Sequence, residues 1–216
     1  MRPRRRIRSR ATAIRRHNRI LARASPRYGS RVIQPWETLS DETLVHYKVF
    51  HVRKSRRRSP RTGAEIGFFL LDTPDWVNVL PITEDGQVVF VRQFRHGPQR
   101  VTLEIPGGLI DAHETDPATA AARELREETG FEAGRLERLG VMNPNPSRMG
   151  NRCFAYVATG CRRIGDLAMD PGEDIEVVTR PLTELDAMVA RGEIEHAIVL
   201  ATLAFYRAWL AERRSI

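Results

Sequence analysis

Three glutamates close together on one predicted helix are the residues of this chain best suited to chemistry. They are Glu124, Glu127 and Glu128, and a glycine pair, Gly107 and Gly108, precedes them. Because positions three and four apart are neighbours on a helix, these carboxylates can converge on a hard cation such as Mg²⁺, which prefers oxygen ligands. The pattern E-x-x-E-E is also common on the solvated face of a helix, so its surroundings must decide between the two interpretations.

The segment that carries these glutamates has signals for both ends of a helix. Asp116 followed by Pro117 is typical of an N-cap with proline at the first helical position, and Gly130 is typical of a left-handed C-terminal stop. The opposite face is small and apolar, and it comprises Ala118, Ala121, Ala122 and Leu125. We therefore expect a helix that packs closely against a sheet.

From Gly107 to Phe131 the chain reads GGLIDAHETDPATAAARELREETGF. A glycine, five residues, a glutamate, a spacer and then R-E-L-R-E-E-T-G-F resemble the signature of the Nudix hydrolases. Five residues separate Gly108 from Glu114, as in that family, but eight rather than the usual seven separate Glu114 from Arg123. We expect the extra residue to lengthen the loop and to leave the segment from Arg123 to Gly130 in register.

The resemblance implies a metal-dependent hydrolase that cleaves a nucleoside diphosphate linked to another moiety. It implies that Glu124 and Glu128 are the principal metal ligands, and that Glu127 is a further ligand or the base that activates water. Arg123 would orient one glutamate through charge-assisted hydrogen bonds, and the backbone carbonyl of Gly107 would be an additional ligand. The expected cofactor is Mg²⁺, with Mn²⁺ as the alternative, and it would neutralise charge on phosphate oxygens.

The substrate class depends on residues outside this segment. The stretch DWVNVLPITEDGQVVFVRQFRHG followed by LEIPGG resembles the branch of the family that includes ADP-ribose pyrophosphatases and nucleoside diphosphate sugar hydrolases. The resemblance places Arg95 near the substrate, where a guanidinium suits a diphosphate or ribose oxygen; the alternative is a salt bridge to Glu104. Trp36 and Trp76 are candidates for stacking on a base, although core packing suits Trp76 equally well. The candidate substrate-binding residues are therefore Arg95, Glu104, Trp36 and Trp76.

One more acidic residue is expected after the predicted strand that contains Cys153. The segment DPGEDIEV places Glu173 just before another strand, and the resemblance makes it a candidate catalytic base or ligand of a third metal ion. ADP-ribose pyrophosphatases commonly have a glutamate-x-glutamate pattern there, whereas Pro171 occupies the earlier position in this chain. The alternative for Glu173 is a surface acid at the start of a strand. The loop from Met142 to Asn151 is expected to rim the pocket.

We expect a hydrolase that splits the pyrophosphate of ADP-ribose or a related nucleoside diphosphate sugar into a nucleoside monophosphate and a sugar phosphate. Two alternatives are a non-catalytic protein that binds a nucleotide or RNA, and a hydrolase of dinucleoside polyphosphates or capped RNA. A binding protein has no need of a complete metal site, so the intact Arg123 and three glutamates favour an enzyme. By resemblance, a homodimer is expected, with the strands of residues 37 to 75 at its interface.

The order of the predicted elements indicates an α/β fold. Strand patterns cover residues 46–53, 66–71, 77–83, 87–94, 101–105, 136–142, 152–158 and 175–178, and helical patterns cover 182–190 and 197–210. This order agrees with the Nudix α/β/α sandwich with a mixed sheet that the resemblance implies. We expect a basic leader over residues 1–33, a small antiparallel β extension over 34–75 and the Nudix hydrolase domain over 76–216.

The formal net charge of +8 is unevenly distributed along the 216 residues. Residues 1–28 contain eleven arginines and no acid, which leaves 24 basic and 27 acidic residues in the remainder. We expect the leader to be a flexible tail; a surface helix that contacts nucleic acid or anionic lipid, an organellar transit peptide and a start codon assigned too early are the alternatives. A second basic run, Arg53 to Arg61, is expected to form a solvated hairpin loop.

Composition favours one catalytic domain, because a chain of this length with 41% hydrophobic residues can bury one substantial core. The two cysteines, Cys153 and Cys161, have no partners at metal-ligand spacing, so a reduced chain in the cytoplasm is the simplest inference. The longest apolar run, Ala197 to Phe205, is far shorter than the roughly 20 residues that cross a bilayer. We therefore expect no transmembrane segment.

Overall fold

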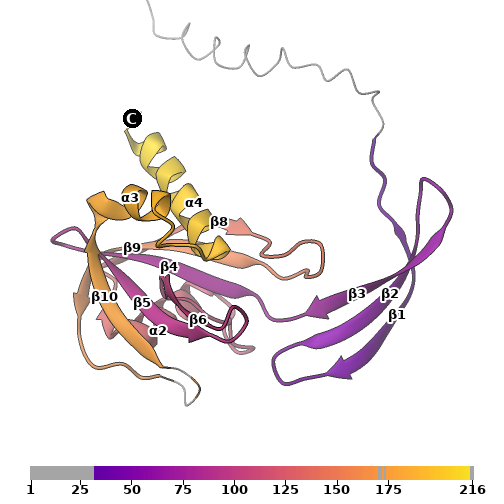
Figure 1. The fold of residues 1–216 in the computed structure, drawn as a ribbon, viewed down its shortest axis with the longest axis horizontal. Helices are drawn as coiled ribbons and strands as arrows, with labels where there is room; N and C mark the ends of the chain where they lie inside the picture. Colours follow the sequence, from indigo (N-terminus) through magenta and orange to yellow (C-terminus); the bar gives the residue numbers. More distant parts are fainter. Residues whose placement is uncertain (1–31, 170–171, 173, 215–216) are drawn as a thin grey trace, which may run out of the picture.

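The computed structural model describes residues 32–169, 172 and 174–214. A mixed sheet lies between helices, and a small second sheet stands to one side of it (Figure 1). The expected α/β architecture with a mixed sheet is thus confirmed. The expectations for residues 1–31 and for Glu173 concern residues outside the described ranges, so they remain predictions.

The large sheet is built around two parallel strands, β4 (Trp76–Thr83) and β9 (Cys153–Arg163). Strands β8 (Arg135–Met142) and β7 (Phe131–Glu132) pair antiparallel with β9, and β5 (Gln87–Arg95) pairs antiparallel with β6 (Arg100–Glu104) and β10 (Ile175–Pro181). Strands β4 and β9 are buried along most of their length, which is the pattern of strands covered on both faces, and β5 is buried in its first half. Strand β9 continues beyond the predicted end at Ala158, so both cysteines lie within it as free, buried thiols.

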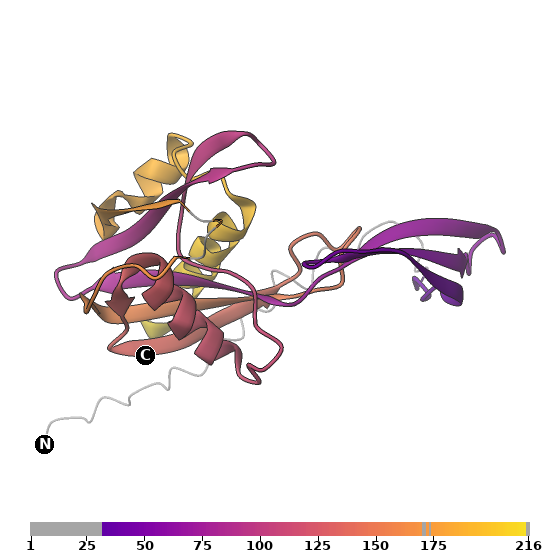
Figure 2. The same cartoon turned by 90° about the horizontal axis from the view of Figure 1, so that it is seen from below.

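Helices cover both faces of this sheet. Helix α2 (Pro117–Thr129) packs on one face, and the 3₁₀ turn η1 (Leu182–Glu184), α3 (Leu185–Ala190) and α4 (Ala197–Arg213) lie on the other (Figures 1 and 2). Each face has its own apolar cluster, one built around Val79 and Leu125 beneath α2, the other around Leu80 and Leu203 beneath α3 and α4. None of the helices in the described ranges has the length and apolarity that a bilayer-spanning helix needs.

Helix α2 begins where the sequence predicts. Asp116 has an extended backbone, its side chain accepts a hydrogen bond from the Ala118 amide at 3.0 Å, and Pro117 is the first helical residue. One part of the predicted apolar face is wrong, because Ala120 is buried and Ala122 is exposed. The buried side of the helix also contains two of the glutamates, and this turns Ala122 toward solvent.

The small sheet consists of three antiparallel strands in the order β1 (Glu37–His46), β2 (His51–Arg58) and β3 (Glu65–Asp72). It matches the expected antiparallel addition, but two details of the prediction are wrong. The first strand ends at His46 instead of beginning there, and most of the basic run from Arg53 forms the central strand rather than a loop. Cross-strand carboxylates compensate these arginines: Arg53 pairs with Asp41 and Asp72, and Arg58 with Glu37 and Glu65.

Gly130 ends α2 in a conformation that only glycine adopts without strain. Its φ is 71°, and a Cβ there would lie 2.3 Å from the Gly165 carbonyl oxygen. Gly86, in the turn between β4 and β5, has a similar φ of 76° but no atom within 4 Å of the same position. An alanine at Gly86 would therefore add backbone strain alone, whereas an alanine at Gly130 would add the same strain and a steric clash.

We predict that Gly86→Ala lowers the free energy of unfolding by about 1 kcal/mol, because only the backbone is strained. Gly130→Ala is expected to lower it by about 2 to 4 kcal/mol, because the contact with Gly165 is added to the same strain. Denaturant unfolding followed by circular dichroism measures both values. Equal losses in the two variants would show that the contact with Gly165 has no energetic effect.

Candidate active site

Arg123 binds three glutamates at once. Its Nε and Nη2 donate to the two oxygens of Glu114 at 3.0 and 3.1 Å, and its Nη1 donates to Glu124 Oε1 at 2.9 Å and to Glu127 Oε2 at 3.0 Å. Nη2 also donates to the Leu109 carbonyl at 3.0 Å. These bonds, first of all the one to Glu114, raise the pKa of the Arg123 guanidinium. A planar, permanently charged group thus fixes the spacing of the carboxylates around it.

Glu114 belongs to the site despite the longer spacer that follows it. Its side chain is only 3% exposed, and it accepts a hydrogen bond from the Asp111 amide at 2.9 Å. The hydrogen bonds from Arg123 hold the pKa of the Glu114 carboxyl below its usual value. Arg123 lies on α2 and reaches back across the loop before this helix to Glu114.

The glycine turn brings backbone atoms against the glutamate face of α2. The Gly107 amide donates to Glu128 Oε2 at 3.0 Å, and a Cβ on Gly108 would lie 2.4 Å from Glu124 Oε1. Glu124 and Glu128 are 8% and 3% exposed. Glycine at position 108 is therefore what leaves room for the Glu124 carboxylate beside the turn.

These oxygen donors suit a hard divalent cation, since buried carboxylates are expensive without positive partners. Within the described ranges, no three carboxylate, imidazole or thiol side chains are close enough to form a closed metal cage. Arg123 contacts both Glu124 and Glu127, so a cation would require these side chains to close around it. The residue types and their burial fit a divalent ion, and their present spacing is the one that Arg123 imposes.

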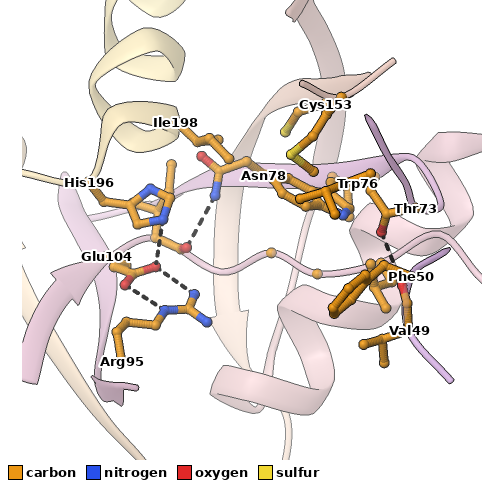
Figure 3. Close-up of a pocket in the computed structure, with 17 residues that line it drawn as sticks. Val49, Phe50, Thr73, Trp76, Asn78, Arg95, Glu104, Cys153, His196 and Ile198 are labelled. Carbon is orange, nitrogen blue, oxygen red and sulfur yellow. Dashed lines mark hydrogen bonds and ion pairs between the residues drawn. The ribbon is translucent and has the colours of Figure 1, made fainter. Parts of the chain in front are cut away.

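A cavity of about 480 Å³ opens beside the glycine turn (Figure 3). Arg95, Glu104 and His196 lie at one end of it, and Phe50 and Trp76 lie at the other. The volume lies within the range of small-molecule sites. The cavity therefore offers a polar end and an apolar end to one elongated ligand.

Arg95 and Glu104 form the salt bridge that the sequence left open as an alternative. Arg95 donates from Nε and Nη2 to the two Glu104 oxygens at 2.8 and 2.7 Å, and the Thr102 hydroxyl donates to Glu104 Oε1 at 2.6 Å. Burial raises the pKa of Glu104, but the bonds from Arg95 and Thr102 outweigh burial, so this pKa lies below its usual value. Arg95 is 40% exposed and lines the cavity, so Glu104 anchors it there.

The two candidate tryptophans lie in different places. Trp76 lines the cavity, whereas Trp36 packs edge-to-face on Phe68 of the small sheet, with ring centroids 5.5 Å apart. Trp36 is not part of the cavity wall formed by the described residues. Met149 lines the cavity, as expected for the loop that contains it.

Sequence reasoning missed several residues of the cavity wall. His196 precedes α4, and its Nε2 lies 3.9 Å from Glu104 Oε2. Phe50 reaches the cavity from the hairpin between β1 and β2. Asn78 also lines it, and its signal in the sequence is a single polar residue within the apolar run Val77–Val79. The first two carry no sequence signal, because only the tertiary fold brings them to the site.

Comparison with known proteins decides the family. The NUDIX domain family model matches residues 72–203. The chain belongs to the Nudix family. An ADP-ribose pyrophosphatase of Mycobacterium tuberculosis is 32% identical over 167 residues, which cover 77% of this chain and 80% of that protein. An ADP-sugar pyrophosphatase of Mus musculus is 33% identical over 149 residues, which cover 61% of this chain and 65% of that protein.

A solved structure supports the Nudix fold independently. The crystal structure of an ADP compounds hydrolase matches with a TM-score of 0.75 and 24% identity, over 87% of this chain and all of that chain. The glycine turn and α2 both lie within the matched Nudix range. The cluster around Arg123 thus lies within the part of the chain that matches the Nudix family.

Glu104 is expected to make the stability of this Nudix protein depend on pH. Because its folded-state pKa lies below 4.5, its ionised form stabilises the fold above that pH, and this stabilisation is lost as the pH falls through the folded-state pKa. We predict that the melting temperature falls less steeply for Glu104→Gln than for wild type between about pH 5 and pH 3.

The matched control for this prediction is Glu176→Gln. Glu176 is also paired with an arginine, Arg92, but its side chain is 63% exposed. This control should keep the wild-type slope, because surface ion pairs contribute little to stability. Identical slopes for wild type and Glu104→Gln would contradict the role given to the buried carboxylate.

Proposed function

We propose that this Nudix protein hydrolyses the pyrophosphate of ADP-ribose or a related nucleoside diphosphate sugar to a nucleoside monophosphate and a sugar phosphate. The complete cluster of Arg123, Glu124, Glu127 and Glu128, beside a glycine turn that lines a cavity of about 480 Å³, carries this proposal. The relatives named for ADP-ribose and ADP-sugars support the same substrate class.

The proposed cofactor is Mg²⁺, with Mn²⁺ as the alternative. Glu124, Glu127, Glu128 and the Gly107 carbonyl would hold it, and it would supply positive charge to the phosphate oxygens and to the attacking water. Glu127 is the member of the cluster best suited to accept a proton from water, because its side chain is 37% exposed whereas Glu124 and Glu128 are buried. Glu173 remains the second candidate for the base.

The cavity suggests how the substrate would lie. Arg95, anchored by Glu104, would bind an oxygen of the diphosphate or of a ribose at the polar end. Trp76 and Phe50 would contact the base at the apolar end. The glycine turn also lines the cavity and contacts Glu128, so the diphosphate would lie beside this turn while both ends of the substrate stay bound.

We predict Mg²⁺-dependent release of monophosphate from at least one member of a panel of ADP-ribose, ADP-glucose, GDP-mannose, UDP-glucose and a dinucleoside polyphosphate. Glu128→Gln is expected to lower kcat/KM on the order of 100-fold or more, because it removes a carboxylate proposed to hold the ion. Glu84→Gln, an exposed glutamate in the turn between β4 and β5, is the control and should stay within about twofold of wild type.

Two results would overturn the proposal. The first is a folded wild-type protein that turns over no member of the panel with either Mg²⁺ or Mn²⁺. The second is turnover that Glu128→Gln leaves unchanged. Turnover of the dinucleoside polyphosphate alone would favour the alternative substrate class.

We also propose that the protein is a homodimer that associates through the small sheet. Figure 2 shows this sheet extending away from the main body. Several large apolar side chains of residues 37–72 are at least 40% exposed: Leu44, Val45, Tyr47, Val49, Ile66 and Phe69. An exposed apolar surface of this kind is typical of an interaction site.

For the dimer, sedimentation analysis is expected to give twice the chain mass of 24.6 kDa. Phe69→Asp should shift the protein toward the monomer, because Phe69 is 53% exposed on β3 and the new charge would be buried on association. Val101→Asp, at a similarly exposed position on β6, is the control and should leave the mass unchanged. A monomeric wild type at micromolar concentration would rule out the dimer.

A further inference from the structure

Two single polar residues interrupt apolar runs in the core. Asn78 lies on β4 between two valines, and Thr202 lies on α4 between Ala201 and Leu203. Asn78 is 6% exposed and Thr202 is fully buried, and the Thr202 hydroxyl donates to Asn78 Oδ1 at 2.9 Å. Buried polar groups lower stability unless they are hydrogen-bonded, and an apolar pair could fill the same space. Packing of the core alone therefore does not explain why polar residues occupy these two positions.

The other end of the Asn78 amide reaches the glycine turn. Its Nδ2 lies 3.3 Å from the carbonyl oxygens of both Ile105 and Pro106, and Figure 3 shows the amide directed toward this backbone. Because Thr202 donates to the amide oxygen, the amide nitrogen must face the two carbonyls, which can only accept. Helix α4 is thus linked through Asn78 to the backbone just before Gly107.

The other backbone carbonyl groups of this turn also accept hydrogen bonds from the described residues, except that of Gly107. The Pro106 oxygen accepts a second bond, from the Val79 amide at 2.8 Å, and the Gly108 oxygen accepts from the Val77 amide at 2.9 Å. Among the hydrogen bonds formed within the described ranges, none uses the Gly107 carbonyl oxygen. That oxygen is the one proposed above as a metal ligand.

Asn78 also packs directly against this residue. A Cβ on Gly107 would lie 2.9 Å from Asn78 Nδ2 and 2.3 Å from the Val77 carbonyl oxygen. The backbone at Gly107 therefore has no room to move toward β4. Its amide is fixed on the other side by Glu128, at 3.0 Å.

We infer that Asn78 and Thr202 are a positioning pair that holds the Gly107 carbonyl in place and thereby sets the affinity of the site for its divalent cation. The inference rests on the proposed function, because it requires the turn to bind a metal ion. Thr202 is fully buried, so its hydroxyl acts on the turn through Asn78. Groups that orient metal ligands in this way typically change metal affinity by about 10- to 100-fold when they are removed.

The test compares Thr202→Val and Thr202→Ser in Mn²⁺ binding without substrate, measured by electron paramagnetic resonance of the free ion. Thr202→Val keeps the volume but removes the donor, and we expect its dissociation constant for Mn²⁺ to rise about tenfold. Thr202→Ser keeps the donor but loses a methyl group, so it should bind Mn²⁺ like wild type. Ser55→Ala is the control, because it removes another fully buried hydroxyl, on the small sheet, and should leave Mn²⁺ binding unchanged.

A second comparison tests whether the two residues act as a unit. Asn78→Leu removes the amide, and the double variant with Thr202→Val should bind Mn²⁺ no more weakly than Asn78→Leu alone. Additive losses of affinity in the double variant would show that Thr202 acts by another route, and would overturn the inference.

The remaining outcomes separate this inference from the proposed function. Wild type that hydrolyses the substrate panel and binds Mn²⁺, with Thr202→Val binding equally well, would overturn the positioning role alone. Equal weakening by Thr202→Ser and Thr202→Val would do the same, because packing rather than the hydroxyl would then be responsible. Wild type that binds neither Mn²⁺ nor Mg²⁺ would overturn the proposed metal site and this inference together.

Discussion

The hydrogen bonds from Arg123 to Glu114, Glu124 and Glu127 are the interactions on which the rest of the site depends. Ionised carboxylates on neighbouring helical turns repel one another, and this repulsion is stronger where water is excluded. A guanidinium among them neutralises the repulsion and sets their spacing through fixed donor directions. Removing it would leave several negative groups, some of them buried, without their common partner, which is far more destabilising than losing a surface ion pair.

That cluster in turn constrains the fold around it. The glycine turn must approach α2 closely enough for the Gly107 amide to reach Glu128, and the absence of a Cβ at Gly108 leaves room for the Glu124 carboxylate beside the turn. Small residues such as Ala121 let the helix lie close to the sheet. The same sheet, through β4 and β6, supports the turn. The contacts of the helix, the turn and the sheet are therefore all satisfied in the same arrangement, as expected of a sequence that specifies a single structure.

Local signals in the sequence predicted the elements that local interactions determine. The ends of α2 follow from Asp116, Pro117 and Gly130, which act on their own backbone neighbours. Most of strand β2 was predicted as a loop. Its arginines are compensated by carboxylates on β1 and β3, and that pairing exists only after the chain has folded. His196 and Phe50 could not be predicted either, because only the folded chain brings them to the cavity. Asn78 and Thr202 were visible as polar interruptions of apolar runs, but neither sequence position reveals its partner.

Arg95 shows why two interpretations of a sequence need not exclude each other. A salt bridge to Glu104 and a place near the substrate were set out as alternatives. The geometry contains the salt bridge, and it also places Arg95 in the wall of the cavity, where the proposed substrate would lie. A free arginine side chain has up to about 2 kcal/mol of rotamer entropy to lose when it binds a ligand. The two bonds to the buried Glu104 restrict Arg95 when the protein folds, so less of that entropy remains to be lost on binding. An anchored arginine can therefore bind a diphosphate oxygen more tightly than an unanchored one, although one side of its guanidinium is already occupied.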